Sequence, residues 1–281
     1  MSNVLFDQPG PRARVRQVIY NVVASVAILA ALGGLAWRMN DRGQFDYALW
    51  EVFVTPEYDQ FIFEALVDTL EMAGLSILFA IVFGLFFGLG KLSDHAVVRW
   101  PCWAVVEFFR AVPLLLLIVG IFMMWGIGDG FGAYWSVVIG LTLYNGSVLA
   151  EVFRAGVLAV PAGQSEAAYA IGMRKTQVMT IVLLPQAIKI MIPTIISQCV
   201  VALKDTSLGY YITAPGLTYA AKLIYGEFDN QVSTILVISA IYIVVNLILT
   251  ALATWVQRRI VGEKKQLELA VVGTYRTGAE R

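Results

Sequence analysis

Charged side chains inside apolar stretches are the groups of this chain that could do chemistry. Glu107 and Arg110 are three residues apart, as are Glu151 and Arg154, so each pair can share a helix face and form a structural ion pair. A charge in the middle of a bilayer costs roughly 2.5–3.5 kcal/mol, so these groups should face protein or water. The alternative for Arg110 is a place on a translocation pathway, where its guanidinium could bind a carboxylate substrate.

A second set of polar residues follows residue 203. Lys204 and Asp205 are adjacent, so their side chains point about 100° apart on a helix and at least one should pair elsewhere. Asn145 is either an interhelical hydrogen-bond partner, which is favoured, or a pathway group. The tentative substrate pathway comprises Arg110, Asn145, Lys204, Asp205, Thr206 and Ser207.

Signatures of catalysis are missing from the sequence. It has no P-loop, no HExxH and no nucleophile-elbow serine. Cys102 and Cys199 lie in apolar runs without metal-ligand spacing and are predicted to be buried small side chains. We therefore expect no enzyme activity and no metal on this chain. If ATP drives it, ATP and Mg are expected on a separate subunit.

Composition predicts an all-α integral membrane protein. Hydrophobic residues make up 59% and charged residues 14% of the chain, against roughly 45–50% and 25% in soluble domains. The 20 basic and 20 acidic residues cancel, so nucleic acid is not an expected partner. Six apolar runs predict transmembrane helices near residues 18–37, 67–90, 102–126, 133–154, 187–207 and 232–256. Pro193 could bend the fifth.

The first apolar run has a competing interpretation as a signal peptide. It is longer than an ordinary h-region of about 7–15 residues and lacks an A-x-A-like cleavage site, so a retained anchor is favoured. Basic residues set the orientation, because arginines and lysines favour cytoplasmic loops. An internal N-terminus leaves only Arg38, Arg42 and Lys222 outside, so both termini and the loop at 160–180 are predicted to be cytoplasmic.

That loop is predicted to contain a short helix. Pro161 and Gly163 should end the preceding helix, and Ser165 could cap a new one with Glu166 in its first turn. Gly172 permits a turn that a Cβ would hinder. From the residues alone, an ordinary amphipathic interhelical loop remains an equal alternative.

Four motifs change that balance: EFFRAVPLLL (107–116), AEVFRAGVLAVPAGQSEAAYAIG (150–172), VLLPQAIKIMIP (182–193) and LKDTSLGYYITAPGL (203–217). Together they resemble permeases of the polar amino-acid ABC importers, which serve histidine, arginine, glutamine and glutamate. Ala111 and Val112 replace the usual Gly and Thr, and Val182 replaces an Ile. Residues 197–220 and the added N-terminal span are most similar to glutamate-importer permeases of actinobacteria.

The resemblance implies a type I permease core of five helices plus an added N-terminal helix. The implied division is 1–61 for the N-terminal tail, first helix and external segment, 62–260 for the core, and 261–281 for a cytoplasmic tail. Residues 161–175 would form a coupling helix that docks on an ATP-binding subunit. Its implied contact residues are Gly163, Gln164, Glu166, Ala167, Ala168 and Gly172.

The expected function is ATP-driven import of a polar amino acid, with glutamate favoured, across the bacterial cytoplasmic membrane. Expected partners are an ATP-binding subunit dimer, a second permease that is identical or a shorter relative, an external solute-binding protein and membrane lipid. Two alternatives remain, namely an ion-coupled secondary transporter and a non-transporting membrane scaffold or receptor.

Overall fold

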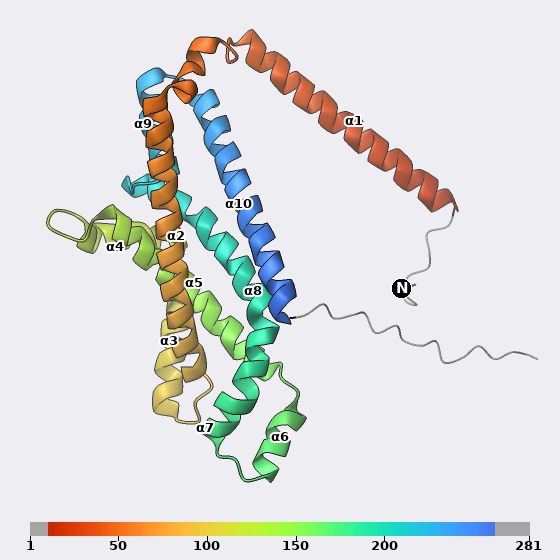
Figure 1. The fold of residues 1–281 in the computed structure, drawn as a ribbon, viewed down its shortest axis with the longest axis vertical. Coiled ribbons are helices and arrows are strands. Elements are labelled where there is room, and N and C mark those ends of the chain that lie inside the picture. The colour runs from red at the N-terminus through yellow and green to blue at the C-terminus, as the bar shows by residue number, and fades with distance from the viewer. Residues whose placement is uncertain (1–10, 262–281) are drawn as a thin grey trace, which may run out of the picture. The chain divides into compact units, whose positions relative to one another are not determined.

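A computed structural model describes residues 11–261, and all regular elements of this part of the chain are helical (Figure 1). The elements are α1 (Pro11–Asp41), η1 (Tyr47–Leu49), η2 (Glu51–Val54), α2 (Pro56–Gly90), α3 (Ala96–Ala111), α4 (Leu114–Ile121), η3 (Phe122–Gly126), α5 (Gly132–Leu158), α6 (Ala162–Ala170), α7 (Lys175–Gln177), η4 (Val178–Leu183), α8 (Leu184–Asp205), η5 (Thr206–Ile212), α9 (Leu217–Phe228) and α10 (Gln231–Val261). The prediction of an all-α fold is confirmed.

Six candidate membrane spans are present within residues 11–261 when one bent helix pair is counted as a single span. α1, α2, α5 and α10 are each long and apolar enough alone, and α8 qualifies together with the helical turns on either side of it. The spans predicted from hydropathy at 18–37, 67–90, 133–154, 187–207 and 232–256 lie in these helices. α2 begins at Pro56, earlier than predicted, because its first turns carry acidic residues that hide a helix from an apolarity criterion.

The span predicted at 102–126 is not one straight helix. α3 and the segment Leu114–Gly126 meet at an angle of 100°. Pro113 has no backbone N–H, and it forces Val112 into an extended conformation with φ −76° and ψ 127°. The apolar pattern continues across this step, so hydropathy alone could not detect the bend.

The chain forms two compact units. Among the described residues, the smaller comprises residues 11–60 together with Ile224–Leu236. In it the Asn230 side-chain amide donates to the Leu49 carbonyl at 3.0 Å, and the Tyr58 and Phe228 rings meet edge to face with centroids 5.2 Å apart. These contacts join η1 and the first turn of α2 to the end of α9 and the residue before α10.

The larger unit comprises Phe61–Leu223 and residues 237–261 of the described chain, and α5 is its central helix. Two apolar clusters lie along α5. One contains Met72, Ile118, Val137, Val138, Leu141, Ile212 and Ala214. The other contains Ala80, Leu149, Phe153, Val157, Val160, Ala187 and Met191. Residues of α2 and α5 occur in both, so the burial of α5 among its neighbours fixes the core.

Two glycines let α2 approach α5 closely. A Cβ on Gly84 would lie 2.7 Å from the Cβ of Leu149, and a Cβ on Gly88 would lie 2.7 Å from the carbonyl oxygen of Ala150. This GxxxG spacing places both glycines on one helix face, where small residues allow close backbone contact.

Candidate functional site

The predicted coupling segment contains a nine-residue helix, α6, between α5 and α8 (Figure 1). It begins at Ala162, directly after Pro161, which has φ −54° and ψ 131°. The predicted cap at Ser165 is wrong. Ser165 lies inside the helix and its hydroxyl donates to the Ala162 carbonyl at 2.8 Å. Glu166 is therefore outside the first turn, because Pro161 ends the extended segment four residues earlier than expected.

The end of α6 is a tight turn at Gly172, which has a φ of +83°. The Gly172 N–H donates to the Tyr169 carbonyl at 2.9 Å, and the Met173 N–H donates to the Ala168 carbonyl at 3.2 Å. These bonds satisfy carbonyls that the end of a helix leaves without partners. A left-handed conformation of this kind favours glycine, as expected for the predicted turn.

Five of the six residues implied as ATPase contacts are exposed: Gly163, Gln164, Glu166, Ala167 and Gly172. Ala168 differs, because it is only 5% exposed and faces inward. Ala168 therefore packs α6 against the rest of the chain, and the opposite face of the helix is available to a partner. Gln164 adds a link to α8, because its side-chain oxygen accepts a bond from the Gln186 amide at 3.3 Å.

A salt bridge connects the start of α7, the short helix that follows α6, to the loop between α2 and α3. Lys175 pairs with Asp94, and this bonded ammonium lowers the pKa of the Asp94 carboxyl from its usual value. Both groups are solvent-exposed. The α2–α3 loop therefore lies at the same end of the larger unit as α6.

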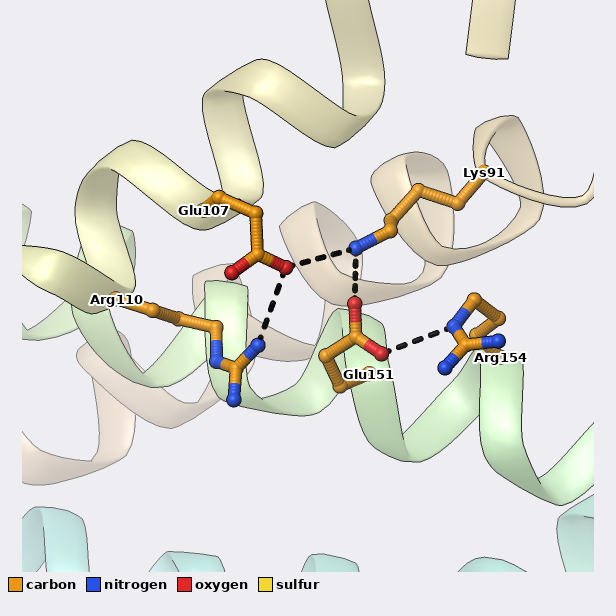
Figure 2. Close-up of polar contacts among 5 residues, drawn as sticks. All are labelled: Lys91, Glu107, Arg110, Glu151 and Arg154. Atoms are coloured by element: carbon orange, nitrogen blue, oxygen red, sulfur yellow. Dashed lines mark hydrogen bonds and ion pairs between the residues drawn. The ribbon is translucent and has the colours of Figure 1, made fainter. Parts of the chain in front are cut away.

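A layer of five charged side chains joins α2, α3 and α5 at this end (Figure 2). We call Lys91, Glu107, Arg110, Glu151 and Arg154 the charged layer. The Lys91 ammonium donates to Glu107 Oε1 at 3.3 Å and also pairs with Glu151. Arg110 Nη1 lies 3.3 Å from Glu107 Oε1, and Arg154 Nε lies 2.9 Å from Glu151 Oε2.

Lys91 is the member of this layer that sequence reasoning missed. Its side chain is only 5% exposed and bridges the two short-range pairs. A lysine directly after the long apolar helix α2 could have signalled this role. Its partners lie 16 and 60 residues away, which no local spacing rule covers.

Asn145 lies in α5 and is 2% exposed. Its Oδ1 accepts a hydrogen bond from the Gln198 amide of α8 at 2.5 Å. Its Nδ2 has no partner within residues 11–261. The Oδ1 atom thus forms the interhelical hydrogen bond that the sequence predicts. The Nδ2 atom is a buried donor without a partner in this part of the chain.

The remaining predicted pathway residues lie where α8 becomes a 3-10 helix. Lys204 is exposed, Asp205 is half-buried and Thr206 is buried. The Thr206 hydroxyl donates to the Leu203 carbonyl at 2.7 Å. Ser207 contributes its carbonyl, which accepts from the Thr218 hydroxyl at 3.3 Å.

The structure forms no ion pair to Lys204 or Asp205 among residues 11–261. The expectation that at least one of them pairs elsewhere is therefore not met within this part of the chain. The two side chains do not join Arg110 either, because Arg110 pairs with Glu107 in the charged layer.

Comparison with known proteins supports a transport role. Residues 80–262 match the family model described as "Binding-protein-dependent transport system inner membrane component". The chain is 37% identical over 227 residues to the glutamate transport system permease protein GluD of Corynebacterium glutamicum, covering 79% of this chain and 83% of the relative. It is 28% identical over 211 residues to the glutamate/aspartate import permease protein GltK of Escherichia coli, covering 71% and 93%.

Solved structures agree with these matches. An amino acid ABC transporter crystallised with histidines has a chain that is 30% identical, with a TM-score of 0.67 and coverage of 72% of this chain and 95% of that one. The MetNI methionine ABC transporter, at 19% identity and a TM-score of 0.63, shares the fold. The resemblance to ABC importer permeases of polar amino acids is confirmed. The chain therefore belongs to the family of inner membrane components of binding-protein-dependent transport systems.

Proposed function

We propose that this chain is a permease subunit that imports glutamate, with ATP hydrolysed on a separate subunit that binds ATP and Mg. The observation that carries the substrate is the 37% identity to a glutamate permease over 79% of the chain. Relatives of lower identity include a probable glutamine permease and an arginine permease of Bacillus subtilis, at 33% and 29%. Glutamate is therefore the substrate to test against these two.

The same proposal assigns α6 as the site where ATP-driven motion enters the chain. Its exposed face is free for a partner, Ala168 anchors the opposite face, and the Gly172 turn fixes its exit. A short helix held at both ends can transmit a rigid-body movement to the spans that flank it. Glu166 supplies a carboxylate on the exposed face for contact with an ATP-binding subunit.

The pathway is assigned to Lys204, Asp205 and the neighbouring hydroxyls, with Asn145 as a further polar group. Lys204 is exposed and without an ion pair within residues 11–261, so its ammonium is available to a carboxylate substrate. Arg110 is the weaker candidate because Glu107 already binds its guanidinium.

The exposed apolar surface of the spans supports the proposal that this chain works together with other subunits. The apolar window of α10 is 6% buried, and we propose lipid or a further subunit as the cover of its exposed face. We propose a second permease subunit, an ATP-binding subunit dimer and an external solute-binding protein, with both termini of this chain in the cytoplasm.

Reconstitution tests this assignment. The permease, its ATP-binding subunit and its binding protein are placed in liposomes, and ATP hydrolysis is measured with glutamate, glutamine, arginine and histidine in turn. We expect stimulation by glutamate above the other three, together with glutamate uptake. Equal or greater stimulation by arginine or glutamine would contradict the substrate assignment.

An ion-coupled secondary transporter would behave differently. The bent pair α3–α4 is the kind of broken helix that such transporters contain, but none of the comparisons supports that alternative. Uptake that stops when the proton or sodium gradient is collapsed, and that continues without ATP, would support it. A scaffold or receptor would bind partners without any uptake.

A further inference from the structure

A cavity of about 550 Å³ opens beside the charged layer and has no role in the proposed transport cycle. We call it the Arg99 pocket. Its lining combines Arg99 and the indole rings of Trp100 and Trp103 with four members of the charged layer, two basic and two acidic: Lys91, Arg154, Glu107 and Glu151. The α2–α3 loop, α3 and α5 supply these residues, so all of them belong to the larger unit.

Positive charge exceeds negative charge in and around this pocket. The carboxylates of Glu107 and Glu151 are shared among three cations of the charged layer. Arg99 adds a fourth cation, and it forms no ion pair within residues 11–261. Its Nη1 donates only to the Ser93 carbonyl, at 3.3 Å. The pocket therefore has excess positive charge to offer an anion, and a guanidinium suits the oxygens of a phosphate.

The two tryptophans point to a lipid as the source of that anion. Trp100 is 61% exposed and Trp103 is 47% exposed. Their rings lie edge to face with centroids 5.9 Å apart. Exposed indole rings on a membrane helix are typical of the headgroup level of a bilayer. A soluble metabolite gives no reason for two large apolar surfaces to flank the basic groups.

The pocket lies at the end of the larger unit that carries α6. Lys91 follows the last residue of α2, and the adjoining loop is tied to the region after α6 by the Asp94–Lys175 pair. With α6 on the cytoplasmic side, as proposed above, the pocket faces the inner leaflet. Basic pockets between membrane helices on this side bind anionic headgroups.

We infer that the Arg99 pocket binds an anionic phospholipid of the inner leaflet. Arg99 and Arg154 hold the phosphate oxygens, and Trp100 and Trp103 contact the glycerol region and the upper acyl chain. Lys91 stays bound to its two carboxylates and contributes to phosphate binding only through the electrostatic field of its ammonium group. This inference does not depend on which amino acid is transported.

Quenching by brominated lipids tests this inference. The permease complex is placed in phosphatidylcholine nanodiscs that contain equal mole fractions of either brominated phosphatidylglycerol or brominated phosphatidylcholine. The Trp100→Phe/Trp103→Phe variant gives the background of the other tryptophans. We expect brominated phosphatidylglycerol to be enriched about fivefold at the pocket, the factor that about 1 kcal/mol from the one uncompensated basic residue, Arg99, produces.

Matched variants assign the effect to Arg99. Arg99→Gln removes the charge but keeps a donor for the Ser93 carbonyl, and it should abolish the preference. Arg258→Gln removes an exposed basic residue of α10 and should leave the preference unchanged. Equal quenching by both lipids in the unaltered protein, or full preference in Arg99→Gln, would overturn the inference. Displacement of the brominated lipid by millimolar inorganic phosphate or glutamate would also overturn it and would assign the pocket to a soluble anion.

Discussion

Lys91 and Glu151 are sixty residues apart in sequence and form an ion pair that joins the end of α2 to α5. The same ammonium also binds Glu107 of α3, so one side chain connects three helices (Figure 2).

Replacing Lys91 by Met should destabilise the protein. The substitution leaves two carboxylates facing each other without their shared cation, and breaking a buried pair costs about 3–5 kcal/mol. Because Glu107 and Glu151 keep partial solvent contact and one arginine each, we expect about 2 kcal/mol here. The melting temperature, followed by tryptophan fluorescence of the purified complex, measures the change.

Lys175→Met is the matched control, since this lysine also binds a carboxylate but in solvent. We expect no measurable loss of stability at neutral pH, and equal melting temperatures for the two variants would refute the role assigned to Lys91. Because the pKa of Asp94 is lowered in the folded protein, the small stabilisation from its pair is present at neutral pH. It is lost as the pH falls through that lowered pKa.

Gly172→Asp should abolish ATP-driven uptake while the permease remains in the membrane. The residue has a φ of +83°, and among residues 11–261 no atom beyond its two chain neighbours lies within 4 Å of the position that a Cβ would occupy. The defect therefore comes from backbone strain, roughly 1–2 kcal/mol for a side chain in this conformation, and from a charge at the proposed docking face. Uptake assays with immunodetection of the permease measure it.

Gly163→Ala provides the comparison for Gly172. Gly163 lies in α6, is not among the glycines with positive φ, and has open space around it. An alanine there should keep full transport. Normal transport by Gly172→Asp would exclude the coupling assignment, whereas loss of transport by Gly163→Ala would mean that the docking face does not tolerate even an added methyl group.

Lys204→Ala should stop transport without disrupting the complex. The side chain is exposed and has no ion pair within residues 11–261, so its loss removes no internal contact of that kind. We expect an assembled complex that still cleaves ATP and no longer moves glutamate. Lys189→Ala, on the same helix and also exposed, is the control and should transport normally. A Lys204→Ala protein with unchanged uptake would remove Lys204 from the pathway.

Asn145 and Gln198 should show energetic coupling. Their bond joins α5 to α8, and interhelical hydrogen bonds in membranes contribute about 0.6 kcal/mol on average with a maximum near 1.7. A double-mutant cycle with Asn145→Ala and Gln198→Ala, read by unfolding, should give a value in this range. If the two substitutions have additive effects, this hydrogen bond makes no contribution to the free energy of unfolding.

Gly88→Ala should loosen the contact between α2 and α5. The added methyl group would lie 2.7 Å from the Ala150 carbonyl oxygen, which is part of the backbone and cannot rotate away. Overpacking of this kind costs about 1–3 kcal/mol. Gly74→Ala is the control on the same helix, because within residues 11–261 its Cβ position has no contact under 4 Å apart from the neighbouring backbone of α2. Equal melting temperatures would contradict the close approach.

The sequence predicts most of this fold because apolarity over about 20 residues is a strong local signal. It misses features that depend on geometry or distance. The bend at Val112–Pro113 lies within continuous apolar sequence, and α2 begins in a stretch where Asp59 and Glu64 interrupt the apolarity. Helix α6 begins at Ala162, directly after Pro161, because proline fixes φ, and the cap predicted at Ser165 is not needed.

In the candidate sites, too, the contacts between residues close in sequence could be predicted and the long-range contacts could not. The i,i+3 spacing places Glu107 beside Arg110 and Glu151 beside Arg154, so these pairs are accessible to local reasoning. Lys91 joins them only through the packing of three helices, and the inward orientation of Ala168 follows from how α6 rests on its neighbours. Neither is encoded in the spacing of nearby residues.

The bend between α3 and α4 restricts what can surround this part of the chain. Ala111 and Pro113 are exposed, and the last carbonyls of α3 lack helical partners where the backbone becomes extended. Acyl chains offer no hydrogen bonds. Irregular backbone inside a membrane span is therefore tolerated only against protein or a water-filled cavity. We therefore expect water or a neighbouring subunit to contact the backbone at this bend. Annular lipid should not contact it.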